Sequence, residues 1–263
     1  MHGALGVVGA WASGNYFHWL FDVLPRFHLL ERAGLPLNSI IVANRKAFQR
    51  QTLALMRLSP NLMPLTAETH LLADELVVPA LAVRPRAFPI WACKFLRETF
   101  LPAATIPPDV GKRIYISRRK GGRVMLKEAG LRALLEDAGF SIIRPELLSF
   151  SQQVGAFANA EVIVAPHGAG LANTVFCKPG TQVVEVFDPS YVVVDYWSLA
   201  NEVGLPYRYV IAEKQRGRGG GRFADITVDP AVLMSAVRDA TREVEVVASE
   251  ASGASAYASH RPE

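Results

Sequence analysis

The sequence predicts an α/β protein built around doubly wound parallel sheets. Short apolar runs alternate with helix-like segments along most of the 263 residues, and turn residues bound them. In the second half, five such runs are separated by helix-length segments, which favours a parallel sheet covered by helices on both faces. With 50% hydrophobic and 20% charged residues, the composition is that of an ordinary globular protein.

The first half of the chain is expected to alternate helices and strands. Predicted helices are Phe17–Ala33, Arg45–Leu58 and Trp91–Leu101, and predicted strands are Ser39–Ala43 and Glu75–Val78. The proline-rich segment 102–111 then breaks the pattern. We therefore expect a first domain over residues 1–108, a second over 109–247 and a disordered tail over 248–263.

The second half has a clearer alternation. The predicted strands are Arg113–Ser117, Ser141–Ile143, Val162–Ala165, Gln182–Phe187 and Tyr207–Ile211. The predicted helices are Lys127–Ala138, Ser151–Asn159, Asp195–Val203 and Pro230–Val247, and a further helix is expected to start within Leu171–Phe176. Ligands of such sheets bind at the carboxyl ends of the strands, so we expect the site there.

A glycine turn follows the predicted strand Val162–Ala165. It reads Pro166-His167-Gly168-Ala169-Gly170 and leads into a helix. Free backbone N–H groups at a helix N-terminus bind anions, and glycine lets a phosphate approach closely. The alternative is a turn that needs glycine only for a positive φ angle.

Two other strands carry polar residues suited to the same ligand. The strand Arg113–Ser117 runs into Arg118 and Arg119, and a guanidinium can hold phosphate oxygens with two hydrogen bonds. A solvated turn is the alternative. Glu185 is the one acid in the apolar strand Gln182–Phe187 and needs a partner if buried. A ribose hydroxyl pair and an arginine are equally good partners.

A polar stripe lies on the predicted helix Phe17–Ala33. His18, Asp22 and Arg26 are spaced four residues apart, opposite a broad apolar face. A His–Asp pair suits proton transfer, and a purely structural hydrogen bond is the alternative. Pro25 is expected to kink this helix or to lie at a bend.

Several signatures do not occur in the sequence. There is no Asp-x-Asp, no His-x-x-x-His and no Gly-x-Ser-x-Gly, and Asn173 stands where a dinucleotide fingerprint needs a third glycine. This argues against a carboxylate-held metal ion and a standard dinucleotide fold. Cys93 and Cys177 belong to no Cys-x-x-Cys pair, which favours free buried thiols over one disulfide.

Charge and hydropathy limit the partners. The net charge of +4 suits an anionic small ligand or an anionic membrane surface and does not call for nucleic acid. No apolar run reaches the roughly 18 residues of a membrane span, and the N-terminal segment lacks the basic leader of a signal peptide. We therefore expect a cytoplasmic protein, either free or bound peripherally at the inner face of the membrane.

Five segments occur in the order of a known family. They are Asn15–Arg26, Arg113–Arg119, Pro145–Phe150, Pro166–Leu171 and Phe176–Glu185. Together they resemble the family 61 glycosyltransferases, including bacterial members described as capsular polysaccharide biosynthesis proteins. The resemblance covers residues 14–211.

The resemblance implies a GT-B-like fold, with two Rossmann-like domains facing a cleft. This sequence departs from the family pattern in length, because fewer than 15 residues precede Asn15, so we expect an abbreviated N-terminal domain. It implies an inverting, metal-independent transfer from a nucleotide diphosphate sugar to a glycan or lipid-linked glycan, without a cofactor. The domain 1–108 would then be the acceptor side, and 109–247 would bind the nucleotide sugar. A truncated, non-catalytic relative that binds nucleotide sugars or glycans is the alternative.

The family's site residues can be carried onto matching positions. Asp22 is the expected catalytic base, with His18 as its helper. The expected acceptor-side residues are Asn15, Trp19 and Arg26. The expected donor-binding residues are Ser117, Arg118, Arg119, His167, Gly168, Ala169, Gly170, Leu171, Asn173 and Glu185, with Glu185 near the nucleoside.

Overall fold

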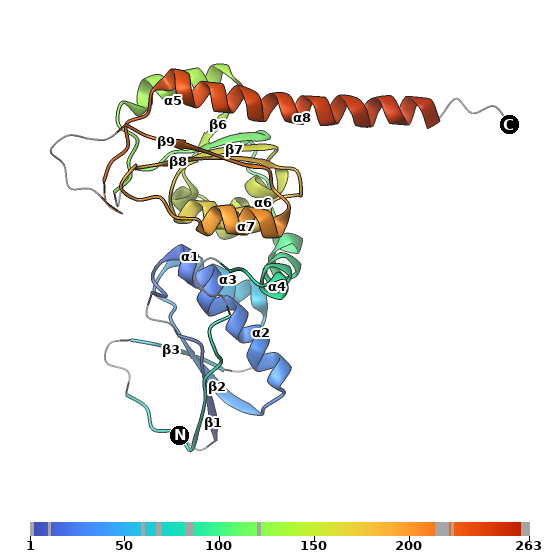
Figure 1. Cartoon of the computed structure of the whole chain (residues 1–263). Coiled ribbons are helices and arrows are strands. Elements are labelled where there is room, and N and C mark those ends of the chain that lie inside the picture. The colour runs from blue at the N-terminus through green and yellow to red at the C-terminus, as the bar shows by residue number, and fades with distance from the viewer. Residues whose placement is uncertain are drawn as a thin grey trace.

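The computed structural model describes residues 3–9, 12–58, 61–66, 70–82, 87–119, 122–213, 221 and 224–258. Within these residues, the strands form two parallel sheets with interleaved helices (Figure 1). The predicted α/β class is therefore confirmed. We call the elements up to residue 103 the N-terminal unit and those from residue 113 the C-terminal unit.

The N-terminal unit contains one parallel sheet with the strand order β3-β2-β1-β4. Its strands are β1 (Ala4–Val7), β2 (Leu37–Val42), β3 (Asn61–Pro64) and β4 (Glu75–Val77). Its helical elements are α1 (Tyr16–His18), η1 (Trp19–Val23), α2 (Leu24–Ala33), α3 (Ala47–Met56), α4 (Ile90–Phe100) and η2 (Leu101–Ala103). Strands β1 and β3 were not among the predicted elements.

The C-terminal unit contains a second parallel sheet with the order β6-β5-β7-β8-β9. Its strands are β5 (Arg113–Ile116), β6 (Ser141–Ile143), β7 (Val162–Pro166), β8 (Gln182–Phe187) and β9 (Tyr207–Ile211). The chain runs from β5 to β6 on one side and then crosses to β7 on the other. A crevice therefore opens between the carboxyl ends of β5 and β7.

Helices cover both faces of this second sheet (Figure 1). They are α5 (Glu128–Asp137), η3 (Pro145–Leu147), α6 (Phe150–Asn159), η4 (Ala169–Phe176), α7 (Asp195–Val203) and α8 (Pro230–Ala258). Strand β7 shows why two layers form, since successive side chains point to opposite faces. Val162 and Val164 pack in the cluster that includes residues of α5 and α8, whereas Ile163 and Ala165 face the other core.

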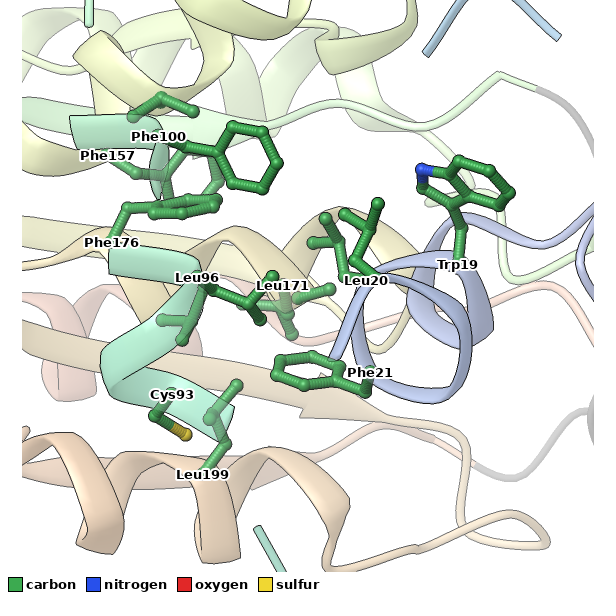
Figure 2. Packing of buried hydrophobic residues seen from close by; sticks show 14 of the residues in the cluster. Trp19, Leu20, Phe21, Cys93, Leu96, Phe100, Phe157, Leu171, Phe176 and Leu199 are labelled. Atoms are coloured by element: carbon green, nitrogen blue, oxygen red, sulfur yellow. The ribbon is translucent and has the colours of Figure 1, made fainter. Parts of the chain in front are cut away.

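That other core is shared by the two units. One cluster of buried side chains contains Trp19 and Phe21 of η1, Leu96 of α4, and Leu171 and Leu199 of the C-terminal unit (Figure 2). Polar contacts cross the same junction: Arg97 of α4 donates to the carbonyl oxygens of Val175 and Cys177 at 2.7 and 2.6 Å. These bonds satisfy carbonyl groups at the end of η4.

The expected helix Phe17–Ala33 is helical but consists of three parts. A π-helix, η1, separates α1 from α2, and the amide of Leu24 bonds to the carbonyl of Trp19. Pro25 follows directly and lies in the first turn of α2, where its missing N–H costs little. The proline thus begins a new helical segment after the π-turn, at the break between η1 and α2.

Most other elements agree with their predicted positions. The bounds of β8, α7 and β9 are those predicted, whereas the segment after the glycine turn is a 3₁₀-helix, η4. Helix α8 continues to Ala258, beyond the expected end at Val247 and into the segment expected to be a tail. Residues 259–263 lie outside the described residues.

Candidate functional site

A cavity of about 510 Å³ lies at the crevice of the second sheet. Its walls include residues that follow β5 and β7, the turn η3, and side chains of α1 and α3 from the N-terminal unit. Of the predicted donor-binding residues, Ser117, Arg118, Arg119 and the segment 168–171 line it. The structure thus brings together residues from two motifs that are about fifty positions apart in the sequence.

Ser117 is the first residue after β5. Its amide bonds to the carbonyl of Ile143 at 2.9 Å, which fixes the backbone as it leaves the sheet. The residue is 2% exposed, and its Oγ has no hydrogen-bond partner among the described residues. A buried hydroxyl without a partner is costly, so this atom is suited to a ligand oxygen in the cavity that it lines.

Two arginines meet at the carbonyl oxygen of His167. Arg118 Nη1 donates to it at 3.3 Å and Arg123 Nε at 2.9 Å. Burial and, next, the charge of Arg123 lower the pKa of Arg118. Two guanidiniums held this close repel each other, so an anion beside them would stabilise the arrangement.

The two glycines of the turn have different roles. Gly168 has φ 174°, which is extended backbone, so the alternative of a turn that needs a positive φ does not apply. A Cβ atom at Gly168 would overlap Arg118 Nη1, so only glycine leaves room for this guanidinium. A Cβ at Gly170 would lie 3.5 Å from the nearest atom, a side-chain carbon of Ile116, which is ordinary contact. A side chain at position 168 would therefore displace the end of the Arg118 side chain, whereas one at position 170 would not.

The other wall of the cavity was not predicted. Tyr16 and Phe48 of the N-terminal unit line it, as do Arg144 and the turn η3. Arg144 Nε lies 3.2 Å from Glu146 Oε1. Pro145–Phe150 is one of the five segments that carry the family resemblance, and this was the one signal that could have identified η3.

His167 and Glu185 do not line this cavity. His167 Nδ1 donates to Glu185 Oε1 at 2.5 Å, and the hydroxyl of Tyr207 donates to Glu185 Oε2 at 2.6 Å. Glu185 is fully buried, and its side-chain partners in the fold are His167 and Tyr207. Burial raises the pKa of Glu185, and the bonds from His167 and Tyr207 oppose that rise. Of the two partners expected for Glu185, no arginine bonds to it among these contacts, and the donor contact of His167 and Glu185 remains a prediction.

Asn173 is also part of the framework. It is fully buried, and its side-chain nitrogen donates to Gln153 Oε1 and to the carbonyl of Gly170. Its oxygen accepts from the hydroxyl of Tyr16 at 2.6 Å. Asn173 thus ties the glycine turn to α1, and its predicted donor contact remains a prediction. Leu171 likewise packs its side chain in the shared core, although it borders the cavity.

The His18–Asp22 pair forms as predicted. His18 Nδ1 donates to Asp22 Oδ2 at 2.6 Å, and the two side chains are 39% and 18% exposed. Neither residue lines the 510 Å³ cavity described above. The ring of His18 instead lies 5.3 Å from that of Phe17, which in turn lies 5.8 Å from Tyr196 of α7. The pair thus lies near the junction of the two units.

The predicted acceptor-side residues have structural contacts. Asn15 caps α1, Trp19 is fully buried with Nε1 bonded to Thr52 Oγ1, and Arg26 is buried with Nη1 bonded to the carbonyl of Gly9. Burial lowers the pKa of Arg26 and the charge of Asp22 opposes this, so Arg26 stays near Asp22. The acceptor-side role of Asn15, Trp19 and Arg26 remains a prediction.

The cysteines of the described part of the chain are buried free thiols, as favoured above. Burial raises the pKa of Cys93 to about 12, and Cys177 is buried as well. No group of three or more His, Cys, Asp or Glu side chains in this part is arranged to hold a metal ion. No helix among the same residues combines the length and the apolar composition needed to cross a membrane.

Comparison with known proteins identifies the family. A search of curated proteins found no match. The sequence model of a family described as Glycosyltransferase 61 matches residues 16–184, from α1 through the glycine turn into β8. The match spans more than half of the chain and supports a glycosyltransferase, with a sugar donor and an acceptor as substrates. The chain therefore belongs to the glycosyltransferase 61 family.

Proposed function

We propose that the protein is an inverting, metal-independent glycosyltransferase. It transfers a sugar from a nucleoside diphosphate donor to a glycan or lipid-linked glycan during surface polysaccharide synthesis, at the cytoplasmic face of the membrane. The observation that carries the proposal is the unpartnered, buried Ser117 hydroxyl in a cavity that Arg118 and Arg119 also line. These are the groups that a diphosphate requires.

In this proposal, the diphosphate binds between Ser117, Arg118, Arg119 and the start of η4. Ser117 donates its hydroxyl hydrogen to a phosphate oxygen, and the helix N-terminus offers free N–H groups. The guanidiniums stabilise the negative charge that grows on the leaving diphosphate in the transition state. Such preorganised charges stabilise the transition state most strongly when the site excludes water.

Asp22 takes the role of the general base. The acceptor hydroxyl oxygen attacks the anomeric carbon, the bond from that carbon to the diphosphate oxygen breaks with its electron pair, and Asp22 takes the proton. His18, bonded to Asp22 at 2.6 Å, orients the carboxylate. One displacement inverts the anomeric centre, and a base of this kind contributes a rate factor of about 10² to 10⁴.

The arrangement is GT-B-like, with the acceptor bound from the N-terminal unit. Two parallel sheets and a cavity lined from both units support this arrangement. His18 and Asp22 belong to the N-terminal unit, whereas Ser117 and Arg118 belong to the C-terminal one.

Thermal unfolding with a panel of nucleoside diphosphates and their sugars, with and without a chelator, tests this function. We expect one nucleotide to raise the melting temperature equally in both conditions, and Ser117→Ala with Arg118→Ala to remove the rise. The matching nucleotide sugar should then be consumed only with an acceptor. A rise that requires metal, or none with any nucleotide, would contradict the proposal. Binding without turnover on any acceptor would support the non-catalytic module instead.

A further inference from the structure

The lining of the 510 Å³ cavity combines charged and aromatic groups. Ser117, Arg118 and Arg119 line it with a hydroxyl and two guanidiniums, and Arg144 and Glu146 line it as well. Tyr16 and Phe48 of the N-terminal unit bring two neighbouring aromatic rings to it, and we call this part of the cavity the aromatic end. A nucleoside diphosphate has the same division, because its phosphates are charged and its base has two apolar faces.

The aromatic wall is fixed in place by contacts across the junction of the two units. The Phe48 ring meets the Tyr16 ring edge-on with centroids 5.3 Å apart. One turn later on α3, Gln51 Oε1 accepts from the amide of Phe150 at 2.6 Å, which attaches this helix to the start of α6. Trp19 holds the same helix through its 2.9 Å bond to Thr52. Phe48 is therefore presented to the cavity by an anchored helix.

The residues around α1 indicate which way the nucleotide sugar is oriented in the cavity. Tyr16 lines the cavity, whereas the next residue, Phe17, contacts Tyr196, whose ring centroid is 5.4 Å from that of His167. His18 and Asp22 do not line the cavity, and Phe17 beside them contacts Tyr196. A sugar that has to reach them must therefore leave the phosphates on the Tyr196 side. The aromatic end is then left for the nucleoside.

We infer that the nucleoside of the donor occupies this aromatic end, with its base against Phe48 and the turn η3 on the other side. The N-terminal unit thereby completes the donor site, and Phe48 determines how well a base is bound. This inference rests on the proposed function, since it assumes that the ligand is a nucleotide sugar. Stacking of a base on an aromatic side chain contributes about a tenfold or larger factor in affinity.

The test uses calorimetric titration of the full chain and of its Phe48→Ala and Phe48→Leu variants. The ligands are the nucleoside diphosphate that gives the largest thermal shift, a second nucleoside diphosphate with another base, and inorganic pyrophosphate. Phe95→Ala is the matched control, because Phe95 is a partly buried aromatic side chain that lines a different cavity, beside α2. Circular dichroism establishes that each variant is folded.

We expect Phe48→Ala to weaken binding of the best nucleotide about tenfold or more and to reduce the preference between the two bases. The affinity for pyrophosphate should not change. The nucleotide affinity of Phe48→Leu should lie between those of the parent chain and Phe48→Ala, and Phe95→Ala should bind every ligand as the parent chain does. An unchanged nucleotide affinity in Phe48→Ala would overturn the inference, and a higher acceptor KM in that variant would place the acceptor there instead. An equal loss for nucleotide and pyrophosphate would also overturn it, as a structural effect. If the unmodified chain binds no nucleotide, the proposed function itself fails.

Discussion

The chain contains two histidine–carboxylate pairs that have similar bonds and different surroundings. His18 and Asp22 are linked at 2.6 Å within one helical segment, and His167 and Glu185 are linked at 2.5 Å between neighbouring strand ends. The first pair is partly exposed. In the second, the side chains are 8% and 0% exposed, and a tyrosine occupies the other carboxylate oxygen.

In the proposed function, this difference separates a chemical role of one pair from a structural role of the other. A carboxylate that accepts a proton from a substrate must be reachable by that substrate, and Asp22 has an accessible side chain. Glu185 is bonded on both oxygens, and it holds His167, whose carbonyl oxygen accepts from Arg118 and Arg123. Glu185 thus holds the residue whose carbonyl group meets the two arginines. In the sequence, Asp22 was the expected base, whereas Glu185 was expected to pair with a ribose or an arginine.

The largest effect is expected at the exposed pair. Asp22→Asn keeps the size of the side chain but removes its basicity, so we expect kcat to fall about 10² to 10⁴-fold. The thermal shift given by the nucleotide should persist, because Asp22 does not line the donor cavity. Initial-rate kinetics measures kcat, and thermal unfolding measures the shift given by the nucleotide. An Asn variant with full activity would remove Asp22 from the role of base.

Substitutions in the buried pair should mainly lower the stability of the fold. Glu185→Ala leaves the His167 and Tyr207 donors buried without their acceptor, and we expect the free energy of unfolding to drop by about 3 kcal/mol. Glu185→Gln, which can still accept from His167, should lose less. Denaturant unfolding of both variants measures this. A Glu185→Ala variant as stable as the parent chain would show that the pair does not support the fold.

The smallest effects test how the buried pair connects to the arginines. Gly168→Ala forces Arg118 away from its position, and we expect the nucleotide to bind about tenfold more weakly, since a charge-assisted hydrogen bond is lost. Gly170→Ala is the matched control, with room for its methyl group, and should change the affinity less than about twofold. Titration calorimetry compares the two. Equal losses in both variants would contradict a specific role for Gly168.

The C-terminal unit followed from the sequence more closely than the N-terminal one. Its strands are short apolar runs between clear turns, and β8 is fully buried, so local pattern and final structure agree. Strand β3 was missed because Asn61 and Pro64 are poor strand residues, which an edge strand tolerates. Strand β1 has only four residues and lies between glycines, which gave too little pattern.

The site was predicted in part for a similar reason. Ser117, Arg118 and the glycine turn share one sheet edge, and parallel topology alone brings strand ends together. Phe48 reaches the cavity only because α3 packs across the junction, which no periodicity reveals. Arg26 is buried against the carbonyl groups of Val8 and Gly9, a contact with the residues just after strand β1 that helical spacing alone does not predict.

The core that both sheets share has a consequence for dissecting the protein. Trp19 and Phe21 of one unit pack in the same cluster as Leu171 and Leu199 of the other. A chain cut at the proline-rich segment would give two fragments, each exposing to water an apolar surface that the intact chain hides. The halves should then aggregate or reassociate, so donor binding has to be studied on the undivided chain.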